Sequence, residues 1–187
     1  MRTSPQKTTT LTATEAAVLG LLGGRESSGY DLLKYAKESV AYFWSPARSQ
    51  LYSILPGLVT SGLATRRTVK QKNRPDKQLY KITRAGRAAL RNWINSEQPP
   101  EPDRNPLLLQ LFFGDQGDAE ALIEHVRERR QQLEQLEAEV EEFERLAPDN
   151  ETERYRRMTR EYGLAYARAL TRWARETERA LEELANT

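Results

Sequence analysis

Residues 49–82 read SQLYSILPGLVTSGLATRRTVKQKNRPDKQLYKI, and the spacing of the apolar residues changes inside this stretch. In residues 51–59 the apolar side chains recur every three or four positions, which predicts an amphipathic helix. From Leu63 apolar and polar residues alternate, residues 70–77 have the composition of a turn, and Leu79 begins a second extended segment. The stretch therefore predicts a helix followed by a two-stranded β-hairpin.

Two further helices are predicted before this stretch. Thr12 and Glu15 have the spacing of a capping box, so a helix should begin directly after Thr12. Gly23 and Gly24 should end it, because glycine readily adopts the left-handed conformation found at helix C-termini. The apolar spacing in residues 28–40 predicts a second, short amphipathic helix.

The helix in the quoted stretch and the one after the hairpin have their own start signals. Ser45 followed by Pro46 predicts an N-cap with proline at the first helical position. Pro56 lies inside the third helix and should bend it, because it removes a backbone hydrogen bond. Thr83 is expected to cap a fourth helix that ends near Ile94.

Charge is divided unevenly along the chain. Residues 1–98 contain 16 Lys and Arg against 6 Asp and Glu, whereas residues 99–187 contain 13 against 21. Between residues 66 and 91 there are ten basic residues and a single acidic residue, Asp76. A basic half joined to an acidic half is typical of a nucleic-acid-binding module attached to a segment that does not contact the polyanion.

The composition excludes several classes of site. The chain has no Cys and one His, His125, so thiolate metal sites, disulfides and a cysteine nucleophile are ruled out. It also has no glycine-rich phosphate loop. Neither a signal peptide nor a membrane span is predicted. We therefore expect a cytoplasmic protein that is not an enzyme and that holds neither a metal nor a cofactor.

The second half predicts two long antiparallel helices. An apolar cluster at residues 107–113 precedes a heptad-like pattern at residues 118–147, and Asn150 begins the last helix with the spacing of a capping box. Such wide apolar faces bury little within one chain, which predicts a homodimer, although a three-helix bundle within one chain is the alternative. The predicted dimer contacts are Phe112, Phe113, Leu133, Leu136, Val140, Phe143, Tyr162 and Trp173.

Three helices, a basic hairpin and a fourth helix in this order are typical of a winged helix-turn-helix that binds double-stranded DNA. The third helix of such a module enters the major groove, and the hairpin contacts phosphates beside it. The predicted fold class is mainly α with a small β-hairpin, as an N-terminal winged helix-turn-helix followed by a long-helix dimerisation domain. The predicted DNA-binding residues are Ser49, Gln50, Tyr52 and Ser53 on the helix, and Arg66, Lys70, Lys72, Arg74 and Lys77 on the hairpin.

The order of these motifs resembles the PadR family of bacterial transcriptional regulators. The resemblance rests on residues 11–22 (LTATEAAVLGLL), 28–32 (SGYDL), 49–58 (SQLYSILPGL) and 80–86 (YKITRAG). Segments within residues 162–173 are similar to the longer branch of that family, with an AphA-like C-terminal helical domain. The resemblance implies a dimeric winged-helix DNA-binding protein, most often a repressor, acting on an inverted-repeat operator.

These patterns predict four parts of the chain. Residues 1–10 should form a flexible arm, and residues 11–96 the winged helix-turn-helix domain. The proline-containing residues 97–106 should form a linker, because proline cannot continue a helix. Residues 107–187 should form the helical dimerisation domain.

Aromatic residues offer a second function. Tyr42, Phe43, Trp44 and Trp93 could line a pocket for a small aromatic or phenolic effector that changes the orientation of the DNA-binding modules. Core packing is the alternative explanation for these side chains. A further alternative is a winged-helix module that senses a ligand or binds a protein without contacting DNA. Such a module should have a neutral or apolar exposed face on its third helix and a less basic hairpin.

Overall fold

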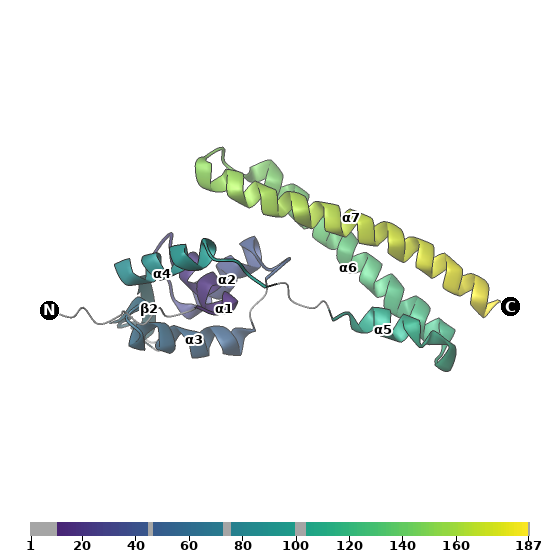
Figure 1. Ribbon diagram of the computed structural model, residues 1–187, viewed down its shortest axis with the longest axis horizontal. Coiled ribbons are helices and arrows are strands. Elements are labelled where there is room, and N and C mark those ends of the chain that lie inside the picture. The colour runs from purple at the N-terminus through teal and green to yellow at the C-terminus, as the bar shows by residue number, and fades with distance from the viewer. Residues whose placement is uncertain (1–10, 45–46, 73–75, 100–103, 187) are drawn as a thin grey trace. The chain divides into compact units, whose positions relative to one another are not determined.

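The computed structural model describes residues 11–44, 47–72, 76–99 and 104–186 of the chain (Figure 1). It consists of two compact units, Met1–Pro99 and Pro100–Thr187. The predicted flexible arm at residues 1–10 lies outside the described residues.

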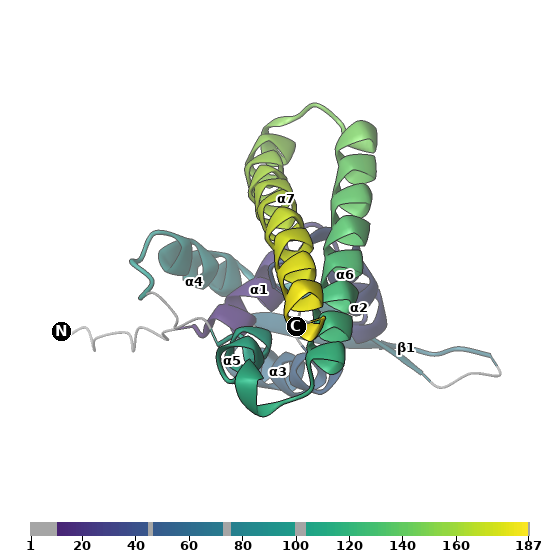
Figure 2. The same cartoon turned by 90° about the vertical axis from the view of Figure 1, so that its right-hand side faces the viewer.

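The first unit contains four helices and one β-hairpin. Its elements are α1 (Ala13–Leu21), α2 (Gly29–Ser39), α3 (Arg48–Thr60), β1 (Ala64–Val69), β2 (Lys77–Ile82) and α4 (Arg84–Ile94). This order confirms the predicted fold class, since the described part of the chain is mainly helical and has one two-stranded antiparallel sheet. Figure 2 shows the hairpin extending away from the helices of this unit.

A short segment before α2 holds the base of the hairpin. The backbone N–H of Ser27 donates to the carbonyl of Tyr80 at 3.0 Å, and the N–H of Tyr80 donates to the carbonyl of Ser27 at 2.9 Å. These two hydrogen bonds add one bridge to the sheet on the free side of β2. The hairpin is therefore fixed to the helical part of the unit at its base.

Local capping signals set most helix boundaries in this unit. Thr12, Ser28 and Thr83 are the N-caps of α1, α2 and α4, and the first two form capping boxes with Glu15 and Asp31. Each cap accepts a hydrogen bond from a backbone N–H that has no partner within its helix. The predicted starts of these three helices are confirmed.

The left-handed conformation that we predicted for the glycines after α1 is found instead at the end of α3. Among the described glycines, only Gly62 has a positive φ, 71°, and it follows α3. Gly23 and Gly24 follow α1 without adopting that conformation, because α1 closes with Leu22 in the right-handed helical region. The prediction of a left-handed end for α1 was therefore wrong, although the helix ends where expected.

One hydrophobic core holds the first unit together. Helices α1, α2 and α3 contribute fully buried leucines, and β2 and the start of β1 cover the remaining side. Burial of a leucine side chain is worth about 1.5–3 kcal/mol, so these residues dominate the stability of the unit. The leucines with the least exposure are Leu19, Leu22, Leu32, Leu51, Leu55 and Leu58.

The second unit is an antiparallel helix pair preceded by a short helix. Its elements are α5 (Pro106–Phe112), the short 3-10 helix η1 (Gly114–Gln116), α6 (Ala119–Leu146) and α7 (Glu151–Ala185). Asn150 is the N-cap of α7, as predicted, but Glu153 forms ion pairs in place of the second half of a capping box. Asp118, which the sequence analysis did not identify as a cap, is the N-cap of α6.

Ion pairs between Arg and Glu run along the whole contact between α6 and α7, and we call them the Arg–Glu ladder. Each guanidinium lies within 3.2 Å of a carboxylate on the other helix, and several arginines contact two carboxylates. The ladder consists of Arg127 and Arg130 with Glu178, Arg175 with Glu134, Arg168 with Glu137 and Glu141, and Arg157 and Arg160 with Glu144.

None of the helices in the described ranges combines the length and the apolar composition that crossing a bilayer requires.

Candidate DNA interface

Helix α3 separates its buried residues from its polar ones. Leu51, Leu55 and Leu58 point into the core of the first unit. The predicted base-reading residues Ser49, Gln50, Tyr52 and Ser53 are all exposed in the first half of the helix. The helix therefore presents a polar face at its N-terminal end, as the sequence predicts.

The start of α3 differs from the prediction and changes the role of one predicted residue. Ser45 and Pro46 lie outside the described residues, and the helix begins at Arg48 with Ala47 as N-cap. Alanine has no side-chain acceptor, so the N-cap residue itself caps no backbone N–H of the helix. The side-chain oxygen of Gln50 accepts a hydrogen bond from the N–H of Ala47 at 3.3 Å. Gln50 thus holds the helix start as well as facing solvent.

The ring of Tyr52 contacts Gly29 and Arg48 near the N-terminal end of α3. A Cβ atom placed on Gly29, the first residue of α2, would lie 2.8 Å from the ring of Tyr52, so glycine is needed for this close approach. The guanidinium of Arg48 lies over the Tyr52 ring, 5.7 Å from its centre. This cation–π contact orients Arg48 at the end of the polar face.

Arg48 is a functional candidate that was not among the residues predicted from the sequence. It is exposed and forms no ion pair with any residue that the structure describes. The signal that could have found it is its position four residues before Tyr52, because such residues are neighbours on a helix surface. Arginine is the side chain that most often recognises guanine in the major groove.

The hairpin carries basic residues of two kinds. Arg66, Lys70 and Lys72 are exposed and form no ion pair within the described ranges, so their charges are available to a polyanion. The predicted contact Arg74 lies outside the described residues. Lys77, in contrast, forms an ion pair with Asp31 of α2 at 3.0 Å. Its role as a DNA contact stays a prediction, and Asp31 already neutralises part of its charge.

Arg67 is the other hairpin residue that serves the fold. Its Nε and Nη2 atoms donate to the two carboxylate oxygens of Glu26 at 2.8 and 2.5 Å. The hydrogen bond from Arg67 lowers the pKa of the Glu26 carboxyl below its usual value. Hydrogen bonds from Lys77 and Ser28 likewise lower the pKa of Asp31. Both carboxylates are therefore ionised at neutral pH, and their stabilising contribution disappears only as the pH falls through these lowered pKa values.

The four residues of the predicted effector pocket come from the turn after α2 and from α4, and they differ in exposure. Tyr42 and Phe43 form an edge-to-face pair with ring centres 4.8 Å apart, and about half of Phe43 is exposed. Trp93 is half-buried on α4 and packs against the core of the first unit. Trp44 is also half-buried, and its indole N–H is covered without a hydrogen-bond partner in the described part of the chain.

The predicted dimer contacts divide into buried and exposed residues. Leu133 and Val140 of α6 are buried within a single chain, so their side chains are not exposed to a second copy in this structure. A heptad pattern does not distinguish a seam within one chain from a seam between chains. Leu136 and Trp173 are half-buried. The exposed members are Phe112, Phe113, Phe143 and Tyr162.

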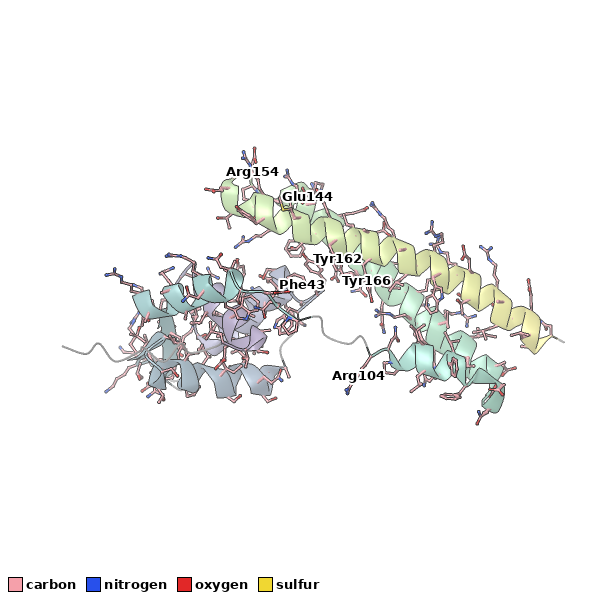
Figure 3. All side chains as sticks on the ribbon, viewed as in Figure 1. Phe43, Arg104, Glu144, Arg154, Tyr162 and Tyr166 are labelled. Atoms are coloured by element: carbon pink, nitrogen blue, oxygen red, sulfur yellow. The ribbon has the colours of Figure 1, made fainter. Side chains whose placement is uncertain are left out.

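Two apolar surfaces of the second unit remain uncovered in a single chain. Helix α5 has no buried residue at all, and Phe112 is 78% exposed. On α7, Tyr162 stacks with Tyr166 at 6.3 Å, and Figure 3 shows both rings on the same side of the helix. Exposed apolar surface of this extent usually marks an interaction site.

The described residues include no group of three or more His, Asp or Glu side chains that could hold a metal ion. The single histidine, His125, is exposed on α6. The candidate site therefore consists of the α3 face and the hairpin.

Comparison with known families divides the chain in the same two regions. A family described as the transcriptional regulator PadR-like family matches residues 18–92. A second family, described as the virulence activator alpha C-terminal region, matches residues 104–182.

Two curated proteins are similar to part of this chain. The negative transcriptional regulator PadR of Bacillus subtilis is 39% identical over 98 residues, which are 52% of this chain and 54% of that protein. The chain thus spans about half the length of the curated relatives it matches. A second relative, from Mycobacterium tuberculosis, is named a probable transcriptional regulator and is 37% identical over 93 residues, which are 49% of each chain.

Solved structures match over most of the chain. Bacillus subtilis PadR in complex with operator DNA superposes with a TM-score of 0.75 at 24% identity, covering 91% of this chain and 99% of that one. The same protein in complex with p-coumaric acid has a TM-score of 0.68 at 23% identity, with coverage of 91% and 99%. The Vibrio cholerae virulence activator AphA has a TM-score of 0.70 at 25% identity, with coverage of 92% and 99%.

Proposed function

Since this chain belongs to the PadR-like family of transcriptional regulators, we propose that it is a dimeric repressor that binds an inverted-repeat operator. One observation carries the proposal for this chain. The exposed polar face of α3 and the unpaired cations of the hairpin, Arg66, Lys70 and Lys72, belong to one compact unit. Phosphate contacts from the hairpin would supply most of the affinity, and α3 would supply the selectivity. Because bacterial operators are cytoplasmic DNA, the proposal includes the cytoplasm as the site of action.

The proposed base-reading residues are Ser49, Tyr52, Ser53 and Arg48, with Gln50 contributing if its hydrogen bond to Ala47 is released on binding. Arg74 keeps its predicted role as a hairpin contact, whereas Lys77 would contribute less, because Asp31 already pairs with it. Support from a relative comes from the Bacillus protein, which has been crystallised with its operator DNA.

Fluorescence anisotropy tests the proposal directly. The full chain is titrated onto the duplex upstream of its own gene and onto a shuffled duplex, each at several salt concentrations. We expect tight, selective binding whose logarithm falls steeply with the logarithm of salt concentration. Equal, salt-insensitive binding to both duplexes would contradict a sequence-specific regulator. Absence of binding at low salt would favour the protein-interaction module instead.

Replacing Lys70 and Lys72 together by Ala should weaken binding to both duplexes, because phosphate contacts carry no sequence information. The salt slope should decrease by about two, or roughly one for each lost contact. Arg154→Ala is the matched control, since this exposed arginine of α7 is in the other unit and has no ion pair in the described chain. If the double variant keeps the slope of the original protein, the hairpin lysines do not contact phosphates.

The dimer is proposed on the exposed apolar surface of α5. A second copy is the occupant we favour, because two modules on a two-fold axis would read half-sites about 34 Å apart, as an inverted repeat requires. Phe112→Glu should raise the dimer dissociation constant by roughly 30-fold or more, because about 2 kcal/mol of apolar burial is lost. Sedimentation velocity over a range of concentrations measures this change.

Ile94→Glu is the control for this experiment, since Ile94 is an exposed apolar residue of the first unit. It should leave the dissociation constant nearly unchanged. If the unaltered protein stays monomeric at all concentrations, or if both variants behave alike, α5 is not the dimer surface.

An aromatic effector is the second component of the proposal. The unpartnered indole N–H of Trp44 could donate to a ligand oxygen, and the Bacillus relative has been crystallised with p-coumaric acid. Adding p-coumaric acid to the protein–DNA complex in the anisotropy experiment tests whether the chain binds an aromatic effector. Release of DNA together with a change in tryptophan fluorescence would support it, and the absence of both would remove this acid as the effector.

A further inference from the structure

A groove of about 400 Å³ lies on the second unit, between α7 and the middle of α6. Its walls are mainly arginine: Arg168, Arg172, Arg175 and Arg179 all contribute. These residues follow one another at steps of four, three and four, so they form a stripe on one face of α7. The groove therefore concentrates positive charge in a unit whose sequence is acidic.

Two of the four arginines are already neutralised by the Arg–Glu ladder. Arg168 donates to Glu137 and Glu141 at 2.6 Å each, and Arg175 donates to Glu134 at 2.8 Å. The hydrogen bond from Arg175 also lowers the pKa of Glu134, so this carboxylate keeps its charge at neutral pH.

The other two arginines differ from those of the ladder. Neither Arg172 nor Arg179 has a hydrogen bond or an ion pair with any residue in the described ranges, and both are exposed. Glu176 lies between them in sequence and also lines the groove, yet it pairs with neither of them. The groove thus presents two guanidinium groups with unused donors and a carboxylate that does not occupy them.

A buried hydroxyl lies in the same groove. Thr171 is 5% exposed, and its Oγ1 atom has no hydrogen-bond partner in the part of the chain that the structure describes. Buried polar groups normally have a partner, so this one requires an explanation. Arg168 and Arg175 lie three residues before it and four residues after it on α7, and both line the same groove.

We propose that this groove binds a small organic or inorganic polyanion with at least two separated oxyanion groups. Arg172 and Arg179 are seven residues apart, which corresponds to about 10 Å along a helix axis, so a single small ion cannot engage both fully. Guanidinium groups bind carboxylates and phosphates through paired hydrogen bonds, and either group meets this geometry. Thr171 would donate a third hydrogen bond from the floor. The site does not depend on DNA binding.

Isothermal titration calorimetry of the full chain without DNA tests the proposal. Citrate is the polycarboxylate probe and pyrophosphate is the phosphate probe, each at constant ionic strength. We expect saturable binding of at least one probe, and the stronger of the two identifies the preferred oxyanion. Arg172→Gln and Arg179→Gln should each weaken it by about tenfold, as expected for loss of one charge-assisted hydrogen-bonded contact.

Arg154→Gln is the matched control, because it removes an exposed, unpaired arginine from α7 outside the groove. It should change the affinity less than twofold. Thr171→Val, which keeps the shape of the side chain, should weaken binding without removing a charge. Far-UV circular dichroism verifies that each variant is folded.

Three results would overturn the proposal. The first is the absence of saturable heat with either probe. The second is equal weakening by Arg154→Gln, which would mean a general charge effect. The third is a lower dimer fraction in the Arg172→Gln/Arg179→Gln protein without a change in anion binding, which would assign the groove to acidic side chains of a second copy.

Discussion

Gly86→Ala is expected to lower the free energy of unfolding of the first unit by about 3 kcal/mol, at the upper end of the range for overpacking. A Cβ atom at this position would lie 2.1 Å from the carbonyl oxygen of Leu63 and 2.9 Å from Ile82. That carbonyl cannot move freely, because it accepts hydrogen bonds from the N–H and the hydroxyl of Thr83 at 3.0 and 3.1 Å. Relief of the overlap therefore requires separation of α4 from the start of the hairpin.

The measurement is urea unfolding followed by tryptophan fluorescence in a Trp173→Phe background. The remaining Trp44 and Trp93 then report on the first unit alone. Gly20→Ala is the control, because a Cβ atom on this helical glycine meets nothing within 4 Å. It should stabilise the unit by about 0.5–1 kcal/mol through the better helix propensity of alanine. Equal stability of the two variants would contradict the close packing of α4 against the hairpin.

Arg160→Met is expected to destabilise the α6–α7 pair by about 3 kcal/mol, because it leaves a buried carboxylate without its main partner. Arg160 donates to Glu153 at 2.6 Å and to Glu144 at 2.7 Å. The side chains of Arg160 and Glu153 are only 10% and 7% exposed. Without Arg160, Glu153 keeps a single ion pair, with the half-exposed Arg156.

Thermal unfolding monitored by circular dichroism at one fixed protein concentration measures this loss, since dimerisation would couple to stability. Arg154→Met serves as the control and should change stability by less than about 0.5 kcal/mol, because Arg154 is exposed. Adding Glu153→Gln to Arg160→Met should recover part of the loss by removing the uncompensated charge. If the single and double variants are equally stable, the buried charge is not the cause.

The sequence was sufficient for features that depend on neighbours along the chain. The caps Thr12, Ser28 and Thr83 each accept a hydrogen bond from the backbone N–H three residues later, so the local pattern contains all the information. The start of α3 was not predictable in this way. Its N-cap, Ala47, lacks a side-chain acceptor, and Gln50 supplies the hydrogen bond from inside the helix.

The roles of charged residues depended on the tertiary structure. Lys70 and Lys77 look alike in the sequence, and only folding brings Asp31 against Lys77 while leaving Lys70 exposed. The same limit applies to the apolar seam, where Leu133 faces its own chain. Arg48 became a candidate only because Gly29 lets the Tyr52 ring lie close to α2, where the guanidinium stacks on it.

The Arg–Glu ladder has a consequence for coexistence with paralogues. A cell with several regulators of one family must prevent their long helices from exchanging between chains, because mixed assemblies would combine unrelated operator preferences. If two copies of this chain exchanged their α7 helices, every ion pair of the ladder, from Arg127–Glu178 to Arg160–Glu144, would form again between the two chains. A paralogue with its charges one helical turn out of step would instead juxtapose like charges. The charge order of the ladder would therefore favour pairing of α6 and α7 from copies of this chain over pairing with a chain whose charges are placed differently.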